Sequence, residues 1–299
     1  AINSVAAVLP TFFGGSADLS HSNMTFIKGD GLQDDAHRTE RNVQFGVREF
    51  AMATVLNGLM LHGGVRVFGG TFFVFSDYLK GALRLSALQN LPVTYVFTHD
   101  SIAVGEDGPT HEPIEHLASL RTIPNTYVFR PADATETQAA WYLSQKTNDR
   151  PTSIVLTRQN LPILENSSFE KVAKGAYVVY ETSADFDTIL IATGSEVALA
   201  IDVARELEKD GSKVRVVSMP SVELFEEQSK EYKEELLPLN IRRRVSLEMG
   251  NSALWYKYVG LDGLAIGIDK FGASAPANKV IEEYGFTVEA VVEKIKNEL

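Results

Sequence analysis

The sequence predicts an α/β protein with two three-layer domains, each built around a mostly parallel sheet. Short β-rich runs alternate with helical patterns through most of the 299 residues, an order that is typical of parallel sheets covered by helices. The length allows two domains at about 150 residues each. A hydrophobic content of 44% is enough to form two cores.

The first domain is expected over residues 1–162. It opens with a helix-like apolar spacing that stops at Pro10, and this pattern, which lacks a clear beginning, suggests that something lies upstream. Strands are expected at the β-rich runs 65–70, 92–100, 126–131 and 152–158. Helices are expected at 42–61, 76–88 and 134–146. The apolar face of the first helix is expected to comprise Val43, Gly46, Val47, Phe50, Ala51, Val55 and Leu59.

A linker is expected over residues 163–175, where Asn, Ser and Lys replace the periodic apolar residues. The second domain is expected over 176–299. Its predicted elements are a strand at 188–196 that runs into a Gly-Ser turn, a helix at 196–210, strands at 213–220 and 242–250, and a helical end from about residue 276.

Composition excludes several classes of function. A net charge of −11 argues against a nucleic-acid partner, because such proteins need a basic face. The chain has no cysteine, so it offers neither a disulfide nor a thiol nucleophile. No apolar run reaches the length of about 18 residues that spans a membrane, and the N-terminus lacks the basic region of a signal peptide. We therefore expect no membrane partner and a cytoplasmic location.

The most unusual stretch, residues 98–113, follows a buried-looking strand. It holds His99 and His111 among acidic residues and glycines. Because loops at the carboxyl ends of parallel strands bind ligands in α/β proteins, a functional loop is favoured over a solvated surface turn, the alternative that composition leaves open. The spacing offers no helical histidine pair and no compact trio of ligands, so no metal site is assigned.

Two further segments carry candidate ligand-binding side chains. Glu49 lies beside the apolar stripe of the expected helix at 42–61, where it is either a solvated flanking residue or an acid–base group. Phe72, Phe75 and Tyr78 are spaced three apart, so they would project to one side and could hold a flat heterocycle. The alternative is that these rings belong to the core.

Anion-binding groups are expected at two other strand ends. Residues 12–20 contain two glycines and Ser16, which can offer backbone amides and a hydroxyl to an anion. Arg158 ends the strand expected at 152–158, and its guanidinium fork suits a phosphate. The tripeptide at 29–31 matches the start of a metal–diphosphate motif, but no Asn-Asn pair follows at the required spacing, so this match is rejected.

Five motifs occur in one order along the chain: GGSADLS, FGVREFAM, GGTFFVFSDYLKGA, THDSIAVGEDGPTHEP and LTRQNLP. Together they resemble transketolase. The resemblance covers nearly all of residues 1–162 and continues more loosely through ATGSEVALA to the end. It implies that the first domain is a thiamin-diphosphate pyrimidine-binding domain and that the second is the transketolase C-terminal domain.

The resemblance implies roles for the candidate residues. Glu49 would hydrogen-bond N1′ of the aminopyrimidine and favour the imino tautomer that deprotonates the thiazolium ring, so it is expected to be both catalytic and cofactor-binding. The other expected catalytic residues are His111 and His99. The expected aromatic residues around the cofactor are Phe72, Phe75 and Tyr78. The residues expected to bind a sugar phosphate are Ser16, His99, Asp107, His111 and Arg158.

The resemblance also implies a cofactor and partners. The cofactor is thiamin diphosphate, with Mg²⁺ or Ca²⁺ bound mainly by an N-terminal diphosphate-binding domain that this sequence lacks. The chain is expected to form a homodimer and to hold half of an active site. The other half would come from a longer form of the chain or from a separate subunit, so the chain alone is expected to be inactive. The implied reaction moves a two-carbon ketol unit from a ketose phosphate to an aldose phosphate.

Two alternatives stay open. The β subunit of a 2-oxo acid dehydrogenase has the same two-domain organisation, although the phosphate set of Ser16, His99 and Arg158 favours sugar phosphates. A non-catalytic dimerisation module would keep the fold, but it would have no need for Glu49 or His111.

Overall fold

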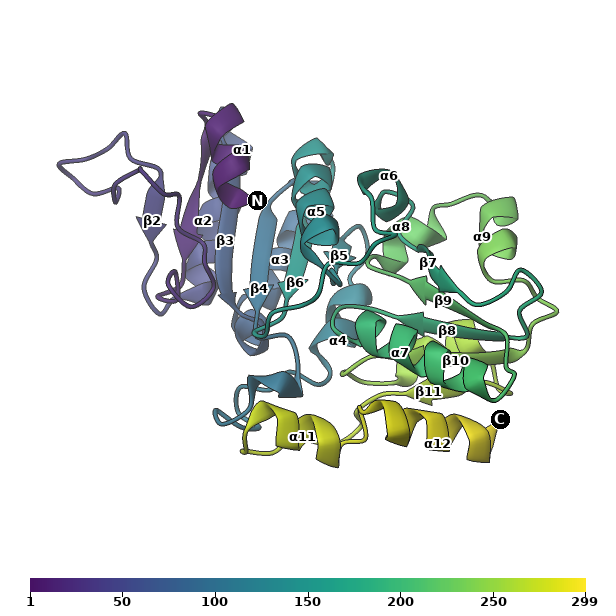
Figure 1. The fold of residues 1–299 in the computed structure, drawn as a ribbon. Coiled ribbons are helices and arrows are strands. Elements are labelled where there is room, and N and C mark those ends of the chain that lie inside the picture. Colours follow the sequence, from purple (N-terminus) through teal and green to yellow (C-terminus); the bar gives the residue numbers. More distant parts are fainter.

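The computed structural model describes all 299 residues, which fold into two α/β units that lie side by side (Figure 1). The strands of the first unit are β1 (Phe12–Ser16), β2 (Asn42–Gln44), β3 (Arg66–Phe72), β4 (Thr94–Thr98), β5 (Tyr127–Phe129) and β6 (Thr152–Leu156). They form one parallel sheet in the order β2-β1-β3-β4-β6-β5. The helices of this unit are α1 (Ile2–Val8), α2 (Glu49–His62), α3 (Ser76–Leu88), α4 (His116–Arg121) and α5 (Ala134–Lys146), with 3-10 turns η1 (Phe73–Phe75) and η2 (Ile102–Val104).

The second unit follows a short helix, α6 (Phe169–Val172). Its strands are β7 (Tyr177–Glu181), β8 (Thr188–Ala192), β9 (Val214–Ser218), β10 (Arg243–Leu247) and β11 (Leu264–Ile266). Their order is β11-β10-β8-β9-β7, and only β7 is antiparallel. The helices are α7 (Glu196–Lys209), α8 (Val222–Glu226), α9 (Lys230–Leu236), α10 (Tyr256–Val259), α11 (Ala277–Glu283) and α12 (Val288–Glu298), with one turn η3 (Ala253–Trp255). The predicted fold class is confirmed.

Helices cover both faces of the first sheet. Helices α1 and α5 lie on one face and α2 and α3 on the other (Figure 1). On the α5 side, the rings of Phe12 and Phe68 stack with centroids 4.7 Å apart, and Trp141 meets both edge-on. On the α2 side, Met52 and Leu56 pack against Gly69 of β3. Successive side chains of β3 point to opposite faces of the sheet, so this strand contributes to two separate cores.

The helix expected over residues 42–61 is wrong in its start and in its buried face. Residues 42–44 form β2, which pairs with β1, and α2 begins only at Glu49. Val47, Phe50 and Val55 of the expected apolar face are exposed by 76%, 54% and 49%. The buried face instead comprises Glu49, Met52, Ala53, Leu56 and Asn57. Because α2 is apolar on both sides, periodicity alone does not choose the core-facing one.

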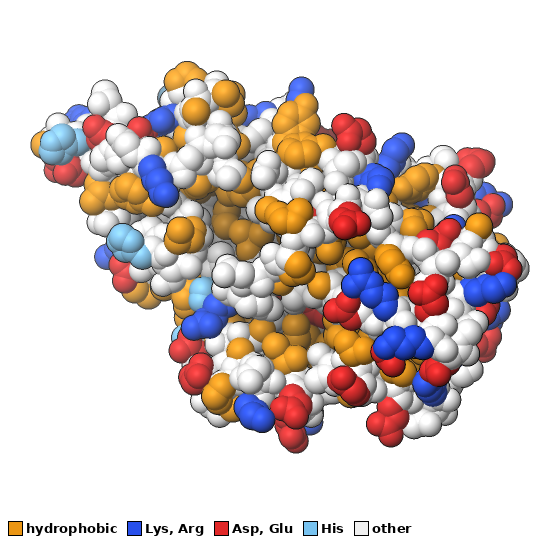
Figure 2. Space-filling model, in the orientation of Figure 1, with side chains coloured by type: hydrophobic (Ala, Val, Ile, Leu, Met, Phe, Trp, Pro, Cys, Tyr) orange, Lys and Arg blue, Asp and Glu red, His pale blue; other side chains and the backbone are white.

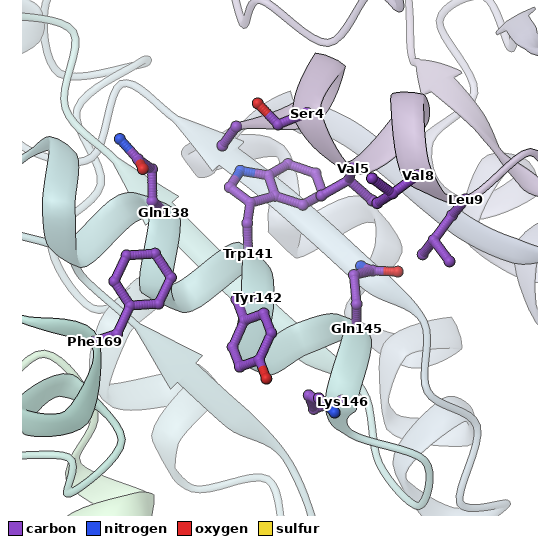
Figure 3. A pocket seen from close by; sticks show the side chains of 11 residues that line it. Ser4, Val5, Val8, Leu9, Gln138, Trp141, Tyr142, Gln145, Lys146 and Phe169 are labelled. Carbon is purple, nitrogen blue, oxygen red and sulfur yellow. The ribbon is translucent and has the colours of Figure 1, made fainter.

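An apolar groove lies between α1, α5 and α6 (Figure 3). Trp141 and Tyr142 of α5 and Val5 and Val8 of α1 line it, together with Phe169. None of these residues belongs to the predicted site. On the face shown in Figure 2, charged side chains gather over the second unit. No helix in the structure is both long enough and apolar enough to cross a lipid bilayer.

Candidate active site

Four strand ends bring most of the predicted site residues to one edge of the first sheet. In the parallel registers, Ser16 pairs with Gly70 of β3, Phe72 pairs with Thr98 of β4, and Thr98 pairs with Leu156 of β6. His99 comes directly after β4, and Arg158 is the second residue after β6, so both lie at the same carboxyl edge. The packed helices α2 and α3 also begin here, because each follows a strand of this sheet.

A row of stacked rings crosses this edge. The His99 imidazole stacks on Phe72 with ring centroids 3.8 Å apart and planes inclined by 27°. Phe72 is 6.2 Å from Phe75, and Phe75 is 5.9 Å from Tyr78, again in stacked geometry. The ring of His111 meets Phe75 edge-on at 5.5 Å. The residues expected to hold a cofactor and those expected to hold a substrate are therefore parts of one cluster.

Glu49 is the first residue of α2 and is only 8% exposed. None of the side-chain hydrogen bonds or ion pairs in the structure involves its carboxylate. The residue is mostly buried while its carboxylate has no partner in the protein, so the carboxylate is free to bind a ligand with a matching polar atom. The rings of Phe72, Phe75 and Tyr78 are partly or largely exposed at the same edge of the sheet, so they too are free to contact a ligand.

His99 has a left-handed backbone with φ of +63°, which is uncommon for a residue other than glycine. Its Nδ1 lies 3.0 Å from Thr98 Oγ1, so Nε2 remains available for a ligand. Burial lowers the pKa of His99 below 6.5, and the positive charge of Arg158 lowers it further, while Asp107 opposes both. His99 is therefore a neutral hydrogen-bonding group at pH 7.

The loop of residues 102–111 carries Asp107 and His111. Gly105 and Gly108 turn it with positive φ angles of 85° and 73°. His111 Nδ1 lies 2.9 Å from Thr110 Oγ1, which leaves its Nε2 free. The side chain of Asp107 is exposed on the same loop. This loop therefore presents one imidazole and one carboxylate beside the aromatic row.

Ser16 is buried, and its hydroxyl proton is donated to the carbonyl of Gly70 at 3.0 Å. The same oxygen accepts the amide of Leu19 at 3.1 Å. A side chain at Gly14 or Gly15 would clash with the backbone of β3 or β2, because a Cβ there would lie 2.0 or 1.8 Å from a carbonyl oxygen. The two glycines thus allow close packing of the strands in the sheet. The proton of the Ser16 hydroxyl is already donated to Gly70 and is not available to an anion.

The rejected match at residues 29–31 has a structural role. Asp30 pairs with Arg41, and Arg41 also donates to the carbonyl of Ala6 at 2.9 Å. This carboxylate is therefore occupied by a structural ion pair.

Glu112 was missed by the sequence interpretation although it directly follows His111. It is only 2% exposed, and its carboxylate fills the space beside Gly272 of the second unit. Burial raises its pKa to about 7. Its position in the loop is visible in the sequence, but its burial depends on a segment 160 residues away in the chain and could not be predicted.

Two family models match the chain in succession. The transketolase pyrimidine-binding domain matches residues 1–163, and the transketolase-like C-terminal domain matches residues 175–287. The chain belongs to the transketolase family. The family expected from the five motifs is confirmed.

Curated relatives and solved structures agree with this family. The chain is 71% identical over 297 residues to a probable transketolase of Streptococcus pneumoniae and 58% identical over 299 residues to the transketolase of Bacillus subtilis. In both cases the match covers 99% of this chain and 45% of the relative. The chain thus spans about half the length of the curated relatives that it matches.

Among solved structures, a transketolase of Pichia stipitis in complex with xylulose 5-phosphate is similar with a TM-score of 0.95 at 42% identity, over 99% of this chain and 44% of that one. A split-gene transketolase, described as an inactive β4 tetramer, is similar with a TM-score of 0.79 at 25% identity. That match covers the whole of this chain and 95% of the other. A chain with nearly the same two-unit extent as this one is therefore known among solved structures of this fold.

Proposed function

We propose that this chain supplies the pyrimidine-binding half of a transketolase active site, which moves a two-carbon ketol unit from a ketose phosphate to an aldose phosphate. One observation carries the proposal: the carboxylate of Glu49 at the start of α2, which has no partner, lies at the same edge of the sheet as the aromatic row from Phe72 to Tyr78, on which His99 stacks. A sugar phosphate is favoured over the substrate of a 2-oxo acid dehydrogenase subunit, because the positive charge of Arg158 lies near enough to His99 to lower its pKa and both side chains can bind a phosphate.

The proposed cofactor is thiamin diphosphate. When bound, it supplies the nucleophile and electron sink for cleavage of a carbon–carbon bond. Glu49 would share a proton with a ring nitrogen of the pyrimidine. A carboxyl group in a fixed position can act in this way as a general acid or base. Phe72, Phe75 and Tyr78 would form an apolar wall that orients the ring and excludes water.

The substrate would lie on the other side of the aromatic row. Arg158 and the neutral His99 would donate hydrogen bonds to the sugar phosphate. His111 would reach the carbonyl end through Nε2, and Asp107 would accept a bond from a sugar hydroxyl. Ser16 would join the phosphate contacts only after its hydroxyl turns away from Gly70.

The surface of α2 and α3 supports the proposed partners. Phe50 and Val55 of α2 and Leu88 of α3 are large apolar side chains that are about half exposed or more. Because α2 and α3 pack against each other, these side chains are suited to contact with a partner. We propose that this surface is covered in a homodimer and by a diphosphate-binding domain, fused or separate, that binds Mg²⁺ or Ca²⁺. The proposed domain boundaries remain 1–162, 163–175 and 176–299, and the proposed location remains cytoplasmic.

The test is to assay ketol transfer from xylulose 5-phosphate to ribose 5-phosphate with this chain alone, with a diphosphate-binding domain alone and with both. Each sample contains thiamin diphosphate and Mg²⁺. We expect transfer only in the mixture, since neither part holds a whole site. A folded complex of the two parts that binds the cofactor and transfers no ketol unit would overturn the proposal.

A further inference from the structure

The carboxyl edge of the second sheet is occupied by the first unit. In α/β proteins this edge is the usual ligand-binding position. Here Thr193, Ser218 and Glu248, which lie at the ends of β8, β9 and β10, bind three side chains of the first unit instead. These side chains are Arg130, Glu136 and Arg121, all of them buried.

Arg130 differs from the other two because it also contacts Asp100, the residue after His99. Its Nε donates to Asp100 Oδ2 at 2.9 Å, and both side chains are no more than 1% exposed. Its Nη1 donates to the hydroxyl and carbonyl of Thr193 at 2.9 and 3.1 Å and lies 3.0 Å from Glu196 Oε2. One buried guanidinium thus joins the residue after His99 to the second unit.

The backbone of Arg130 is fixed to the same unit. Its amide donates to the carbonyl of Pro220 at 2.8 Å, and its carbonyl accepts the amide of Gly194 at 3.0 Å. Gly194 leaves room for the guanidinium, since a Cβ there would lie 2.8 Å from Arg130 Cζ. Main-chain and side-chain hydrogen bonds to the second unit therefore fix Arg130 independently of its bond to Asp100.

His99 needs such support because its backbone is strained. A non-glycine residue persists at positive φ only where its surroundings hold it there, and the φ of His99 is +63°. Asp100 follows it directly, and Arg130 Nε is the only group that hydrogen-bonds the Asp100 carboxylate, whose second oxygen has no partner. The Arg130–Asp100 bond thus joins the residue after the strained His99 to the second unit, whereas the bond from His99 to Thr98 stays within β4 and the residue after it.

We propose that Arg130 is a positioning residue, which uses the second unit as an anchor to hold His99 against Phe72 in the geometry for phosphate binding. The inference rests on the proposed phosphate role of His99. It gives the second unit a part in substrate binding, although none of its residues lies in the candidate site.

The test follows the ring protons of His99 by NMR in the 299-residue chain, at a pH above the His99 pKa, with inorganic phosphate as the probe. The ring current of Phe72 shifts these protons upfield while the two rings stack, so the shift reports the position of His99 directly. Loss of His99 in His99→Gln assigns the resonance. Circular dichroism confirms that each variant is folded.

Four variants separate positioning from general stability. Asp100→Ala removes the tie and leaves Arg130 paired with Glu196, and Arg130→Lys keeps a buried cation that cannot reach both carboxylates. Asp100→Asn keeps an oxygen acceptor for Nε and serves as the conservative rescue. Arg121→Lys is the matched control, because it weakens another buried ion pair between the units, to Glu248, that does not touch Asp100.

We expect Asp100→Ala and Arg130→Lys to lose most of the upfield shift and to bind phosphate about tenfold more weakly, in keeping with the effect of small misplacements at binding sites. Asp100→Asn and Arg121→Lys should match the wild type. Wild-type shifts in folded Asp100→Ala or Arg130→Lys, or equal losses in Arg121→Lys, would overturn the inference. If the His99 ring of the wild type stacks on Phe72 but its proton shifts do not respond to phosphate, the proposed function is contradicted. The upfield shifts of the variants would still decide whether Arg130 positions His99.

Discussion

The imidazole of His99 lies on the ring of Phe72, with centroids 3.8 Å apart. This contact joins the two halves of the proposed site. Phe72 is one of the residues proposed to contact the cofactor, and His99 is one of those proposed to bind the sugar phosphate. Stacked pairs of this kind stabilise an arrangement by about 0.5–1.5 kcal/mol beyond their burial. The position of one ligand is therefore coupled to the position of the other.

Replacement of Phe72 should affect both ligands. Phe72→Leu keeps an apolar side chain but removes the flat support of His99, so we expect weaker binding of inorganic phosphate by about threefold to tenfold, equivalent to about 0.6–1.4 kcal/mol. Tyr78→Leu is the control, since Tyr78 belongs to the same row but contacts Phe75 rather than His99. Calorimetric titration with phosphate measures both. Equal phosphate affinity in Phe72→Leu and wild type would show that the stack does not position His99.

Two buried carboxyl groups should make stability fall as pH rises. Burial raises the pKa of Glu112 and of Glu136 from 4.5 to about 7. Between these values the two groups bind more protons in the folded state than in the unfolded state, so their contribution to stability is fully present below about pH 4.5 and is lost as the pH rises to about 7. Glu136→Gln should remove on the order of 1–3 kcal/mol of this decline, at about 1.4 kcal/mol per pKa unit. Urea unfolding across this range measures it, and an unchanged slope in the variant would contradict the assignment.

The contact between Glu112 and Gly272 should tolerate no added methyl group. A Cβ at Gly272 would lie 1.6 Å from Glu112 Oε2, so Gly272→Ala must displace the carboxylate or the backbone and should cost about 1–3 kcal/mol. Gly58→Ala is the matched control: Gly58 lies inside α2 with no atom within 4 Å of such a Cβ. There the same change should stabilise the chain by about 0.5–1 kcal/mol. Chemical unfolding compares the two, and equal effects would contradict the close contact between Glu112 and Gly272.

The exposed side of α2 should mediate self-association. Phe50→Asp places a charge in this apolar surface, and we expect the dissociation constant of the dimer to rise by about tenfold or more, as for other anchor residues of interfaces. Leu261→Asp is the control, since Leu261 is 96% exposed on the second unit. Analytical ultracentrifugation measures both. A Phe50→Asp chain that associates as tightly as wild type would place the interface elsewhere.

The elements that the sequence predicted best are those with clear local signals. Residues 76–88 and 134–146 form α3 and α5 as expected, and Asp133 caps α5 by accepting the amide of Glu136. The predicted start of α2 was wrong because residues 42–44 form the edge strand β2. Formation of this strand depends on its pairing with β1 rather than on the local sequence pattern. Tertiary pairing overrides a helical period in such cases.

The candidate site divides in the same way. The residues proposed to bind ligands follow strand ends and lie in motifs, so the sequence could indicate that they share one edge of the sheet. The supporting residues could not be found in this way, because Arg130 meets partners that lie 30 and 63 positions away. Buried ion pairs between units leave no local signature, since each partner alone looks like an ordinary charged residue on a strand end or helix.

The turnover of Glu49→Gln tests the central claim most directly. The variant is assayed for ketol transfer in the presence of the diphosphate-binding domain, with Glu293→Gln on the exposed side of α12 as the control. Gln keeps the size of the side chain but cannot exchange a proton with a ring nitrogen, so we predict that turnover falls by about 10²-fold or more while the control is unchanged. Undiminished turnover in Glu49→Gln, with the cofactor bound, would contradict the assignment of this edge as half of a transketolase site.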